Sequence, residues 1–578
     1  MKNTIYFTYI ILCLFSVISQ AQWGPDVRLT NNSAESRTSF NNAWCISASG
    51  SVVHAVWHDL RDGNPEIYYK RSTDGGVVWG TDTRLTNNSA SSFNPSVAVS
   101  GSVVHMAWRD LRDGNFEIYY KRSTDGGVSW GTDTRLTNNT ATSWYPSVAV
   151  SGLVVHVVWQ DYRDGNFEIY YKRSANGGVS WGADTRLSNN SAFSEFPSVA
   201  VSGLVVHVVW HDNRDGNYEI YYKRSTDGGV SWGTETRLTN NSAWSGYSSV
   251  AISSSAVHVA WQDERDGNLE IYYKRSTDGG VSWGTDTRLT NNSARSWDPS
   301  LAVSGPVVHL IWADERNGNL EIYYKRSTDG GVSWGTDTRL TNNFADSWHP
   351  SVAVSGSVVH VIWEDSRDGN WEIYYKRDPT GNLLPPGSAP VLFSPGNNTQ
   401  GWGVNLTLVW YKIPNATNYH VQLSTDSLFN AFIINDSTLI DSVRTVSGLT
   451  DGVWYYWRVR GRNAAGSGPW SSVWRFRTGF VGIKPIGTEI PKEFRLYDNY
   501  PNPFNPTTKI RFDIPGQTLA TLTVYDVLGR EVATLVNDQL NPGIYELEFD
   551  GLNYPSGVYY YRLTADKYVE TRKMILVK

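Results

Sequence analysis

Three glutamates are the residues whose type and spacing could serve catalysis. Glu264, Glu315 and Glu364 stand in successive copies of a repeated segment, each within three residues of a recurring Trp. Two carboxyl groups that flank a glycosidic bond can act as acid and as nucleophile or base in its hydrolysis. No other residue completes a catalytic set around them, so they are candidates only, and the sequence predicts no certain catalytic residue.

Aromatic side chains at positions where the repeated copies differ are suited to binding sugars. Sugar C–H faces stack on aromatic rings, and sugar hydroxyls take directional hydrogen bonds from amides and carboxylates. The alternative is that these rings only fill gaps in the fold. The predicted ligand-binding residues are Trp144, Tyr145, Tyr162, His211, Trp244, Tyr247, Trp297 and Trp348.

A repeated polar turn has the composition of a cation site. In one copy Asp110, Asp113, Asn115 and Glu117 offer alternating oxygen atoms, as calcium loops do. The spacing is not that of an EF-hand, Asp-Gly-Asn is an ordinary turn sequence, and Arg112 can neutralise Asp110. We therefore expect a plain turn and no cofactor, and calcium is the one ion that these four residues could hold.

The elements that must position these residues come from a 51-residue repeat. One histidine recurs at this spacing without insertion, which indicates an array of identical structural units. These histidines are His54, His105, His156, His207, His258, His309 and His360. A histidine present in every unit is expected to be a buried structural residue rather than a metal ligand or a base.

Each repeat contains four strand-sized apolar runs. In the third copy they are residues 146–150, 154–159, 168–173 and 185–188, separated by turn residues. Short connections predict an antiparallel meander, with the strands A to D running from a crowded inner strand to a solvated outer one. The B to C and D to A loops then share one face, and the C to D turns share the other.

The first and last copies predict a closed ring. The seventh copy stops after its third strand, near Arg377, whereas Trp23–Asn32 matches Trp130–Asn139, which carries a fourth strand. The N-terminal strand should therefore complete the last unit and remove the exposed edges. The predicted fold is all-β, with a seven-bladed β-propeller over residues 22–378 followed by two β-sandwich domains.

The C to D turns carry a family resemblance. Residues 123–130, Ser-Thr-Asp-Gly-Gly-Val-Ser-Trp, resemble the Asp-box of sialidase-like propellers, and the box is expected to be a structural turn. The resemblance implies that catalysis would need an arginine triad, a Tyr/Glu pair and an acid. The Phe/Tyr-Arg-Ile-Pro motif is absent and no blade shows an inserted loop, so the sequence favours a non-catalytic protein. The Asp-box residues are Asp74, Asp125, Asn176, Asp227, Asp278 and Asp329.

Two further domains follow a Pro/Gly-rich linker at residues 379–390. Residues 391–479 resemble a fibronectin type III domain, with Trp410, the Tyr419–Leu423 strand and Tyr455 as a tyrosine corner. This module is expected to be a spacer.

After a second linker, residues 480–493, the segment 494–578 closely resembles the type A C-terminal sorting domain of the type IX (Por) secretion system. It opens with Tyr500-Pro-Asn-Pro-Phe-Asn-Pro-Thr-Thr-Lys-Ile510. The resemblance implies passage through the periplasm and then export to the outer surface or beyond, with the secretion machinery as a partner.

Composition and the N-terminus agree with export. Residues 1–21 have the charged start, apolar run and small-residue cleavage site of a signal peptide, and no later run is long enough to span a membrane. The net charge is −6 and no basic tract occurs, so nucleic acid is not an expected partner. Cys13 would leave with the signal, so that Cys45 has no partner for a disulfide.

Two interpretations of function remain. The first is a secreted or cell-surface binding or adhesion protein that recognises glycans, or a cell-surface protein, on the face of the B to C and D to A loops. The alternative is an exo-acting, sialidase-like glycoside hydrolase.

Overall fold

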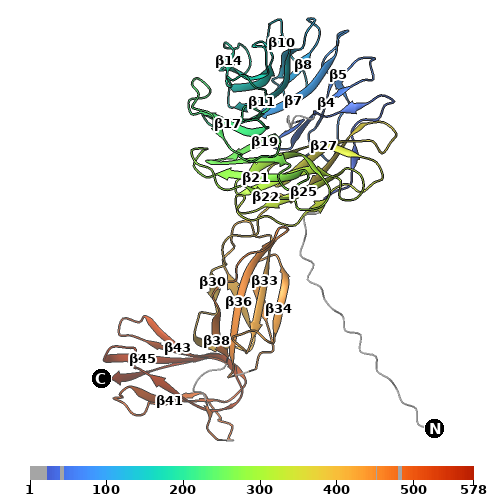
Figure 1. Ribbon diagram of the computed structural model, residues 1–578. Helices are drawn as coiled ribbons and strands as arrows, with labels where there is room; N and C mark the ends of the chain where they lie inside the picture. The colour runs from blue at the N-terminus through green and yellow to red at the C-terminus, as the bar shows by residue number, and fades with distance from the viewer. Residues whose placement is uncertain (1–22, 40–44, 451, 479–483, 488) are drawn as a thin grey trace, which may run out of the picture. The chain divides into compact units, whose positions relative to one another are not determined.

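The computed structural model describes residues 23–39, 45–450, 452–478, 484–487 and 489–578 (Figure 1). Every element in these ranges is a β-strand. The predicted signal peptide and Cys13 lie outside the described residues. The chain divides into two compact units, one ending at Leu383 and one beginning at Leu384, and each is described by itself.

The first unit is the predicted seven-bladed propeller, drawn from blue to yellow in Figure 1. Each blade is an antiparallel sheet in the order A, B, C, D from the axis outward. Blade 1 consists of β2 (Ser36–Arg37) and β3 (Ile46–Ser49), which together form strand A, and of β4 (Val52–Asp59), β5 (Glu66–Ser72) and β6 (Thr83–Arg84). Blade 2 consists of β7 (Ser92–Ser100), β8 (Val103–Asp110), β9 (Glu117–Ser123) and β10 (Thr134–Arg135). Blades 3 and 4 consist of β11 (Ser143–Ser151), β12 (Val154–Asp161), β13 (Glu168–Ser174), β14 (Thr185–Arg186), and β15 (Ser194–Ser202), β16 (Val205–Asp212), β17 (Glu219–Ser225), β18 (Thr236–Arg237). Blades 5 and 6 consist of β19 (Ser245–Ser253), β20 (Ala256–Asp263), β21 (Glu270–Ser276), β22 (Thr287–Arg288), and β23 (Ser296–Ser304), β24 (Val307–Asp314), β25 (Glu321–Ser327), β26 (Thr338–Arg339). Blade 7 consists of β27 (Ser347–Ser355), β28 (Val358–Asp365), β29 (Glu372–Asp378) and the N-terminal strand β1 (Val27–Arg28).

The core lies between the blades. The B strand is an unbroken apolar run because each blade is packed between two others and both of its faces are buried, as Trp159 and Val158 illustrate. The A strands contact one another around the ring, and β27 of the last blade contacts β3 of the first. They enclose a channel of about 210 Å³ lined mainly by Ala, Val and Ile.

The predicted closure is confirmed. Val27 pairs with Tyr375 and Arg28 with Tyr374, so β1 is the outer strand of blade 7. The Arg28 guanidinium lies 2.9 Å from the fully buried carboxylate of Glu372, which also accepts the Asn32 N–H at 3.1 Å. The N-terminal strand thus replaces the outer strand that the seventh repeat lacks.

Replacing Glu372 by Ala is expected to lower the free energy of unfolding by about 2–3 kcal/mol, because hydrogen bonds from charged and backbone donors are lost at a buried acceptor. Glu168 in blade 3 has the same partners, Arg186 and Asn190, within one continuous repeat. We expect Glu168→Ala to cost a similar amount, but only Glu372→Ala to release β1. Hydrogen exchange of the Leu29 amide, which donates to the Ile373 carbonyl at 2.7 Å, measures this release. Equal protection of that amide in both variants would contradict a closing role for β1.

One expectation about the ring is wrong. Blade 1 does contain an insertion, because Arg28 precedes His54 by five more residues than Arg135 precedes His156. The extra length falls between β2 and β3, which divide the inner strand of blade 1 into two pieces that both pair with β4. The 51-residue spacing of the histidines did not reveal it, because the insertion precedes the first histidine.

The Asp-box acts between blades as well as within its turn. The Asp125 carboxylate accepts the Val128 and Ser129 N–H groups, whereas Trp130 packs edge-on against Tyr69 of the preceding blade at 5.0 Å. The hydroxyl of Tyr69 is in turn 2.7 Å from Nδ1 of His54. The repeated histidines are therefore buried partners of these tyrosines.

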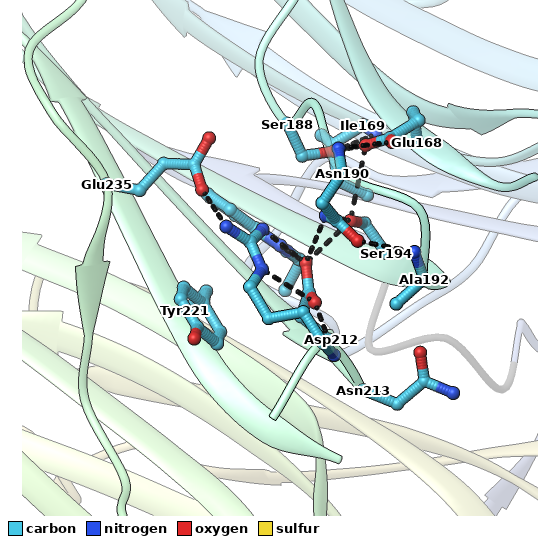
Figure 2. A network of polar contacts seen from close by, with 12 residues as sticks. Glu168, Ile169, Ser188, Asn190, Ala192, Ser194, Asp212, Asn213, Tyr221 and Glu235 are labelled. Carbon is cyan, nitrogen blue, oxygen red and sulfur yellow. Dashed lines mark hydrogen bonds and ion pairs between the residues drawn. The ribbon is translucent and has the colours of Figure 1, made fainter. Parts of the chain in front are cut away.

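The polar B to C turn is a network of ion pairs and hydrogen bonds, shown for blade 4 in Figure 2. Asp212 accepts from Arg214, from the indole N–H of Trp210 and from the hydroxyl of Ser194. Arg214 reaches Glu235 at 2.5 Å and lies 4.2 Å from the ring of Tyr221. The turn therefore locks strands B, C and D together.

The same network occupies the candidate metal ligands of blade 2. Asp110 binds Arg112, Glu117 binds Arg135 and Asn115, and Asp113 binds the hydroxyl of Tyr119. Within the described residues no group of three or more His, Cys, Asp or Glu side chains is arranged to hold a metal ion. The donor set thus fits a turn held by arginines, and we do not propose calcium there.

The second unit contains two sandwiches. The first has one sheet of β30 (Leu392–Ser394), β32 (Leu406–Trp410) and β35 (Val443–Val446), and another of β31 (Thr399–Trp402), β38 (Trp474–Thr478), β36 (Trp454–Asn463), β33 (Asn418–Ser424), β34 (Ile434–Leu439) and β37 (Gly466–Ser467). Trp410 and Trp457 are buried between the sheets, and the Tyr455 hydroxyl accepts the Thr450 N–H at 2.8 Å. The fibronectin type III assignment itself stays a prediction.

The C-terminal sandwich has two four-stranded sheets. They are β39 (Lys484–Pro485), β44 (Gly543–Asp550), β41 (Thr507–Ile514), β40 (Arg495–Leu496), and β43 (Glu531–Leu540), β42 (Thr518–Tyr525), β45 (Gly557–Ala565), β46 (Tyr568–Leu576). Its core includes Phe512, Leu522 and Tyr561. Because β39 pairs with β44, part of the predicted linker 480–493 belongs to this sandwich.

Candidate functional site

The strand register separates the two faces of the propeller. In blade 3, Ser143 pairs with Asp161 and Asp161 with Glu168, which places the D to A loop and the B to C turn at one end. The A to B turn, where Ser151 pairs with Val154, lies at the other end with the Asp-box. We call the first end the loop face, and the predicted ligand-binding residues are on it.

Every inner strand from blade 2 to blade 7 has a bulge near its loop-face end. Within each bulge one residue has a positive φ. This backbone conformation is energetically unfavourable for any residue with a side chain. Six residues share this conformation, with φ between 44° and 53°: Asn94, Tyr145, Phe196, Tyr247, Asp298 and His349. We call them the bulge residues.

Side chains from the preceding blade hold the bulges in place. The Phe196 N–H donates to Oε1 of Gln160 at 2.9 Å, and the Tyr247 N–H donates to Nδ1 of His211 at 3.2 Å. The position after the B-strand Trp, which varies between repeats, therefore supplies a clamp for the next blade. His211 is 3% exposed and burial lowers its pKa to about 3, so it is a neutral structural acceptor rather than a ligand contact.

The bulge residues of blades 3 to 5 form an aromatic arc. The ring centroids of Tyr145 and Phe196 lie 4.6 Å apart, and those of Phe196 and Tyr247 lie 4.7 Å apart. Trp144 packs against Tyr145 at 6.0 Å, and Trp244 packs against Tyr247 at 5.7 Å. Four of the predicted residues are thus brought together, with Phe196 between them.

The bulge residues of blades 6 and 7 form a polar cluster. The His349 ring lies between two buried carboxylates, with Nδ1 at 3.0 Å from Glu364 and Nε2 at 3.5 Å from Asp298. The indole N–H of Trp348 donates to Asp298 at 2.8 Å. Glu364 also accepts from Arg37 at 3.1 Å.

Ring closure completes this cluster. The Thr38 N–H donates to Glu364 at 3.0 Å although the two residues are 326 positions apart in the chain. Burial would raise the pKa of Glu364, but His349 and Arg37 outweigh it, and the pKa is lowered. Burial would lower the pKa of His349, but Glu364 and Asp298 outweigh it, and the pKa is raised. Both shifts favour the charged form of the pair, an imidazolium beside a carboxylate.

A cavity of about 340 Å³ opens beside the polar cluster. Arg109 enters it from blade 2 and is surrounded by rings, with its guanidinium carbon 4.7 Å from Phe116 and 5.3 Å from Phe93. None of the ion pairs in the described part of the chain includes Arg109. The cavity, which we call the loop-face pocket, is lined by Arg37, Thr38, His58, Phe93, Asn94, Arg109, His349 and Glu364.

None of the eight predicted ligand-binding residues lines this pocket. Trp297 contacts Glu315 through its indole N–H at 3.3 Å, and Tyr162 is exposed beside Phe167. Of the three candidate glutamates only Glu364 is in the polar cluster, whereas Glu264 is exposed.

The sequence interpretation missed Asp298, His349 and Asn94. A signal for them exists, because each directly precedes a proline at a position where the repeats differ. Their convergence with Arg37 could not be seen, because it depends on the closure of the ring.

Residues 498–578 match the model of the secretion system C-terminal sorting domain. The chain thus ends in a sorting domain of the type IX secretion system, as the resemblance implied, and the protein is exported to the cell surface or the extracellular space. None of the curated proteins compared with the chain matches it. Among the described residues there is no helix of the length and apolarity needed to cross a membrane.

Several solved structures are similar to the chain. A crystal structure of the polysaccharide lyase Uly1 has 10% identity and a TM-score of 0.43, and covers 62% of this chain and 99% of its own. Trypanosoma rangeli sialidase with 2,3-difluorosialic acid has 12% identity and a TM-score of 0.39, and the match covers 86% of this chain and 85% of the sialidase. The catalytic domain of Coprinopsis cinerea GH62 α-L-arabinofuranosidase has 12% identity and a TM-score of 0.28, and the match covers 40% of this chain and 89% of that domain. Likeness at this level transfers no activity to this chain.

Proposed function

We propose that the protein is a non-catalytic binding or adhesion protein of the cell surface or extracellular space, and that its propeller binds a glycan at the loop-face pocket. The observation that carries the proposal is the composition of that pocket. Phe93 offers an aromatic surface, while Asn94 and Arg37 offer directional hydrogen bonds beside it. Sites for sugars combine these two features.

The polar cluster supports binding rather than hydrolysis. A glycosidase needs two carboxyl groups on either side of the scissile bond. Here Asp298 and Glu364 both contact the same imidazole, so His349 occupies the space between them. The contacts of His349 with these two acids stabilise one side of the pocket, and the imidazole leaves no room for a sugar between the acids.

One contact favours the alternative, a sialidase-like glycoside hydrolase. The Tyr218 hydroxyl donates to Glu195 at 2.7 Å, which is the kind of Tyr/Glu pair that such a mechanism requires. However, burial and the adjacent Glu195 carboxylate raise the pKa of Tyr218, which opposes activation of a nucleophile. Neither residue lines the loop-face pocket. We therefore keep hydrolysis as an outcome of the test.

The test is a glycan array probed with the full secreted chain, followed by affinity measurements on the best ligand. Phe93→Ala is expected to weaken binding at least about tenfold, because an aromatic contact in a pocket is lost. Phe344→Ala is the control, since Phe344 is fully exposed. The absence of glycan binding, or equal effects of the two variants, would refute the glycan proposal. Turnover of a fluorogenic sialoside that is abolished by Glu195→Gln would refute its non-catalytic part.

A further inference from the structure

The sheet that contains β33, β36 and β38 has an outward face rich in arginine. Arg458, Arg460 and Arg462 alternate along β36, and Arg475 and Arg477 lie on the neighbouring β38. Alternate residues of a strand point to opposite faces of its sheet. The alternate residues that point the other way on the same two strands, Tyr455, Trp457, Val459 and Phe476, are buried in the core. The five arginines therefore share the outer surface, which we call the arginine face.

Among the residues that the structure describes, the arginine face has no acidic partner. In the described part of the chain none of its five guanidinium groups takes part in an ion pair, whereas the arginines of the propeller's D strands and B to C turns all do. Residues 391–478 contain seven basic residues and four acidic ones, although the whole chain has a net charge of −6. The basic residues are Lys412, Arg444, Arg458, Arg460, Arg462, Arg475 and Arg477, and the acidic ones are Asp426, Asp436, Asp441 and Asp451.

Neighbouring side chains hold the arginines in fixed positions. Arg458 donates to Gln422 at 2.8 Å, and Arg460 donates to Nδ1 of His420 at 3.2 Å. The ring of Trp470 lies 4.4 Å from the guanidinium carbon of each of these two arginines. Burial lowers the pKa of Arg460, and the adjacent Arg462 and Arg458 lower it further, so the cations repel one another without compensation. Because the side chains are already ordered, an anionic ligand would lose little entropy in engaging them.

We propose that the arginine face binds an anionic polysaccharide through its carboxylate or sulfate groups. A guanidinium is a planar fork that matches such groups with two hydrogen bonds. Arg458, Arg460 and Arg462 repeat every two residues, which is about 7 Å along a strand. A polymer with regularly spaced charges can contact such a row at several points, and the weak contacts then act together.

Nucleic acid fits this surface less well. Binding of single strands relies on aromatic faces that are free to stack with bases, but Trp470 is already stacked on two arginines. The sheet also presents no helix or protruding ribbon that could enter a groove of a duplex. Export to the cell surface or beyond places the face where polysaccharides are encountered.

The experiment measures binding of the full chain to heparin, which carries sulfate groups, and to polygalacturonate, which carries only carboxylates. Neutral dextran and a DNA duplex are the comparison probes. Binding to either anionic polysaccharide is expected to weaken about fivefold for each arginine replaced by glutamine, so about a hundredfold for Arg458→Gln/Arg460→Gln/Arg462→Gln together. Affinity should also fall as salt rises.

Arg475→Gln/Arg477→Gln gives an independent reading, since this pair does not contact Trp470 and keeps the stacked cluster intact. Arg530→Gln is the control, because Arg530 is an exposed arginine of the C-terminal sandwich that pairs with Asp526. We expect the double variant to weaken binding about 25-fold and the control to leave it unchanged. The proposal is overturned if neither polysaccharide binds, if DNA binds as tightly as they do, or if the double variant and the control behave alike.

Discussion

Acidification from pH 7.5 to pH 5 is expected to unfold the propeller. Burial, together with a nearby arginine, lowers the pKa of the B-strand histidine in every blade to about 4. In the unfolded chain the same histidines titrate near 6.5. Between these two values the unfolded state binds more protons, so stability is complete above about pH 6.5 and is lost as the pH falls toward 4.

The expected size of this effect is large. At pH 5 each histidine contributes a loss of about 2 kcal/mol, so the seven together lose about 14 kcal/mol, which is near the upper end of the 5–15 kcal/mol that stabilise a typical domain. The buried Asp161 and its equivalents have lowered pKa values, so their contribution is lost only below about pH 3.8. Raising the pH acts in the opposite sense on His349, whose stabilising ion pair with Glu364 is lost as the pH rises through its raised pKa. The loss between pH 6.5 and 5 therefore belongs to the lowered histidines.

Urea unfolding followed by tryptophan fluorescence at several pH values between 5 and 8 measures this loss. His156→Asn keeps a polar atom near the hydroxyl of Tyr171 but does not titrate. It is expected to be less stable than the wild type at pH 7.5, and to lose about 2 kcal/mol less than the wild type on going to pH 5. A propeller that is as stable at pH 5 as at pH 7.5 would show that the histidines are not held neutral.

Replacing Gly178 by Ala is expected to lower the free energy of unfolding by about 3–5 kcal/mol. A Cβ atom at this position would lie 2.0 Å from the hydroxyl oxygen of Tyr120, which belongs to the preceding blade. That hydroxyl is hydrogen-bonded to His105 at 2.6 Å, so Tyr120 cannot move without losing a buried interaction. Gly178 also has a φ of +80°, which adds backbone strain for any other residue.

Gly165 in the same blade provides a matched control. Its φ is +89°, but nothing lies within 4 Å of a Cβ atom there. Gly165→Ala should therefore show only the backbone strain, about 1–2 kcal/mol. Urea midpoints of the two variants separate the effects. Equal midpoints would mean that the contact between Asp-box and Tyr120 does not stabilise the ring.

The arginine face illustrates a signal that was available in the sequence. Arg458, Arg460 and Arg462 alternate with apolar residues, which predicts one polar side of a strand. Their significance depends on the absence of carboxylates on the neighbouring strands and on the position of Trp470 between them. Those two facts require the register of the sheet, which places Gln422 opposite Arg458 and His420 opposite Arg460.

The sequence by itself determined the architecture of this protein. Strand periods, turn residues and the Asp-box are local properties, and seven copies repeat them, so blade order and closure by Trp23–Asn32 followed from spacing alone. The sorting domain followed from a continuous motif. Each of these features is encoded within one short stretch of chain or within its repetition.

Only the tertiary structure decided which residues form the site. Glu264 and Glu315 follow the last residue of a B strand and extend from loops, whereas Glu364 lies within β28 and is buried between blades. The bulge turns His349 toward Glu364, and ring closure brings in Arg37 and Thr38 from the other end of the propeller. A period of 51 residues places equivalent positions in equivalent surroundings, but the contacts between different positions of neighbouring blades depend on the packing of the closed ring.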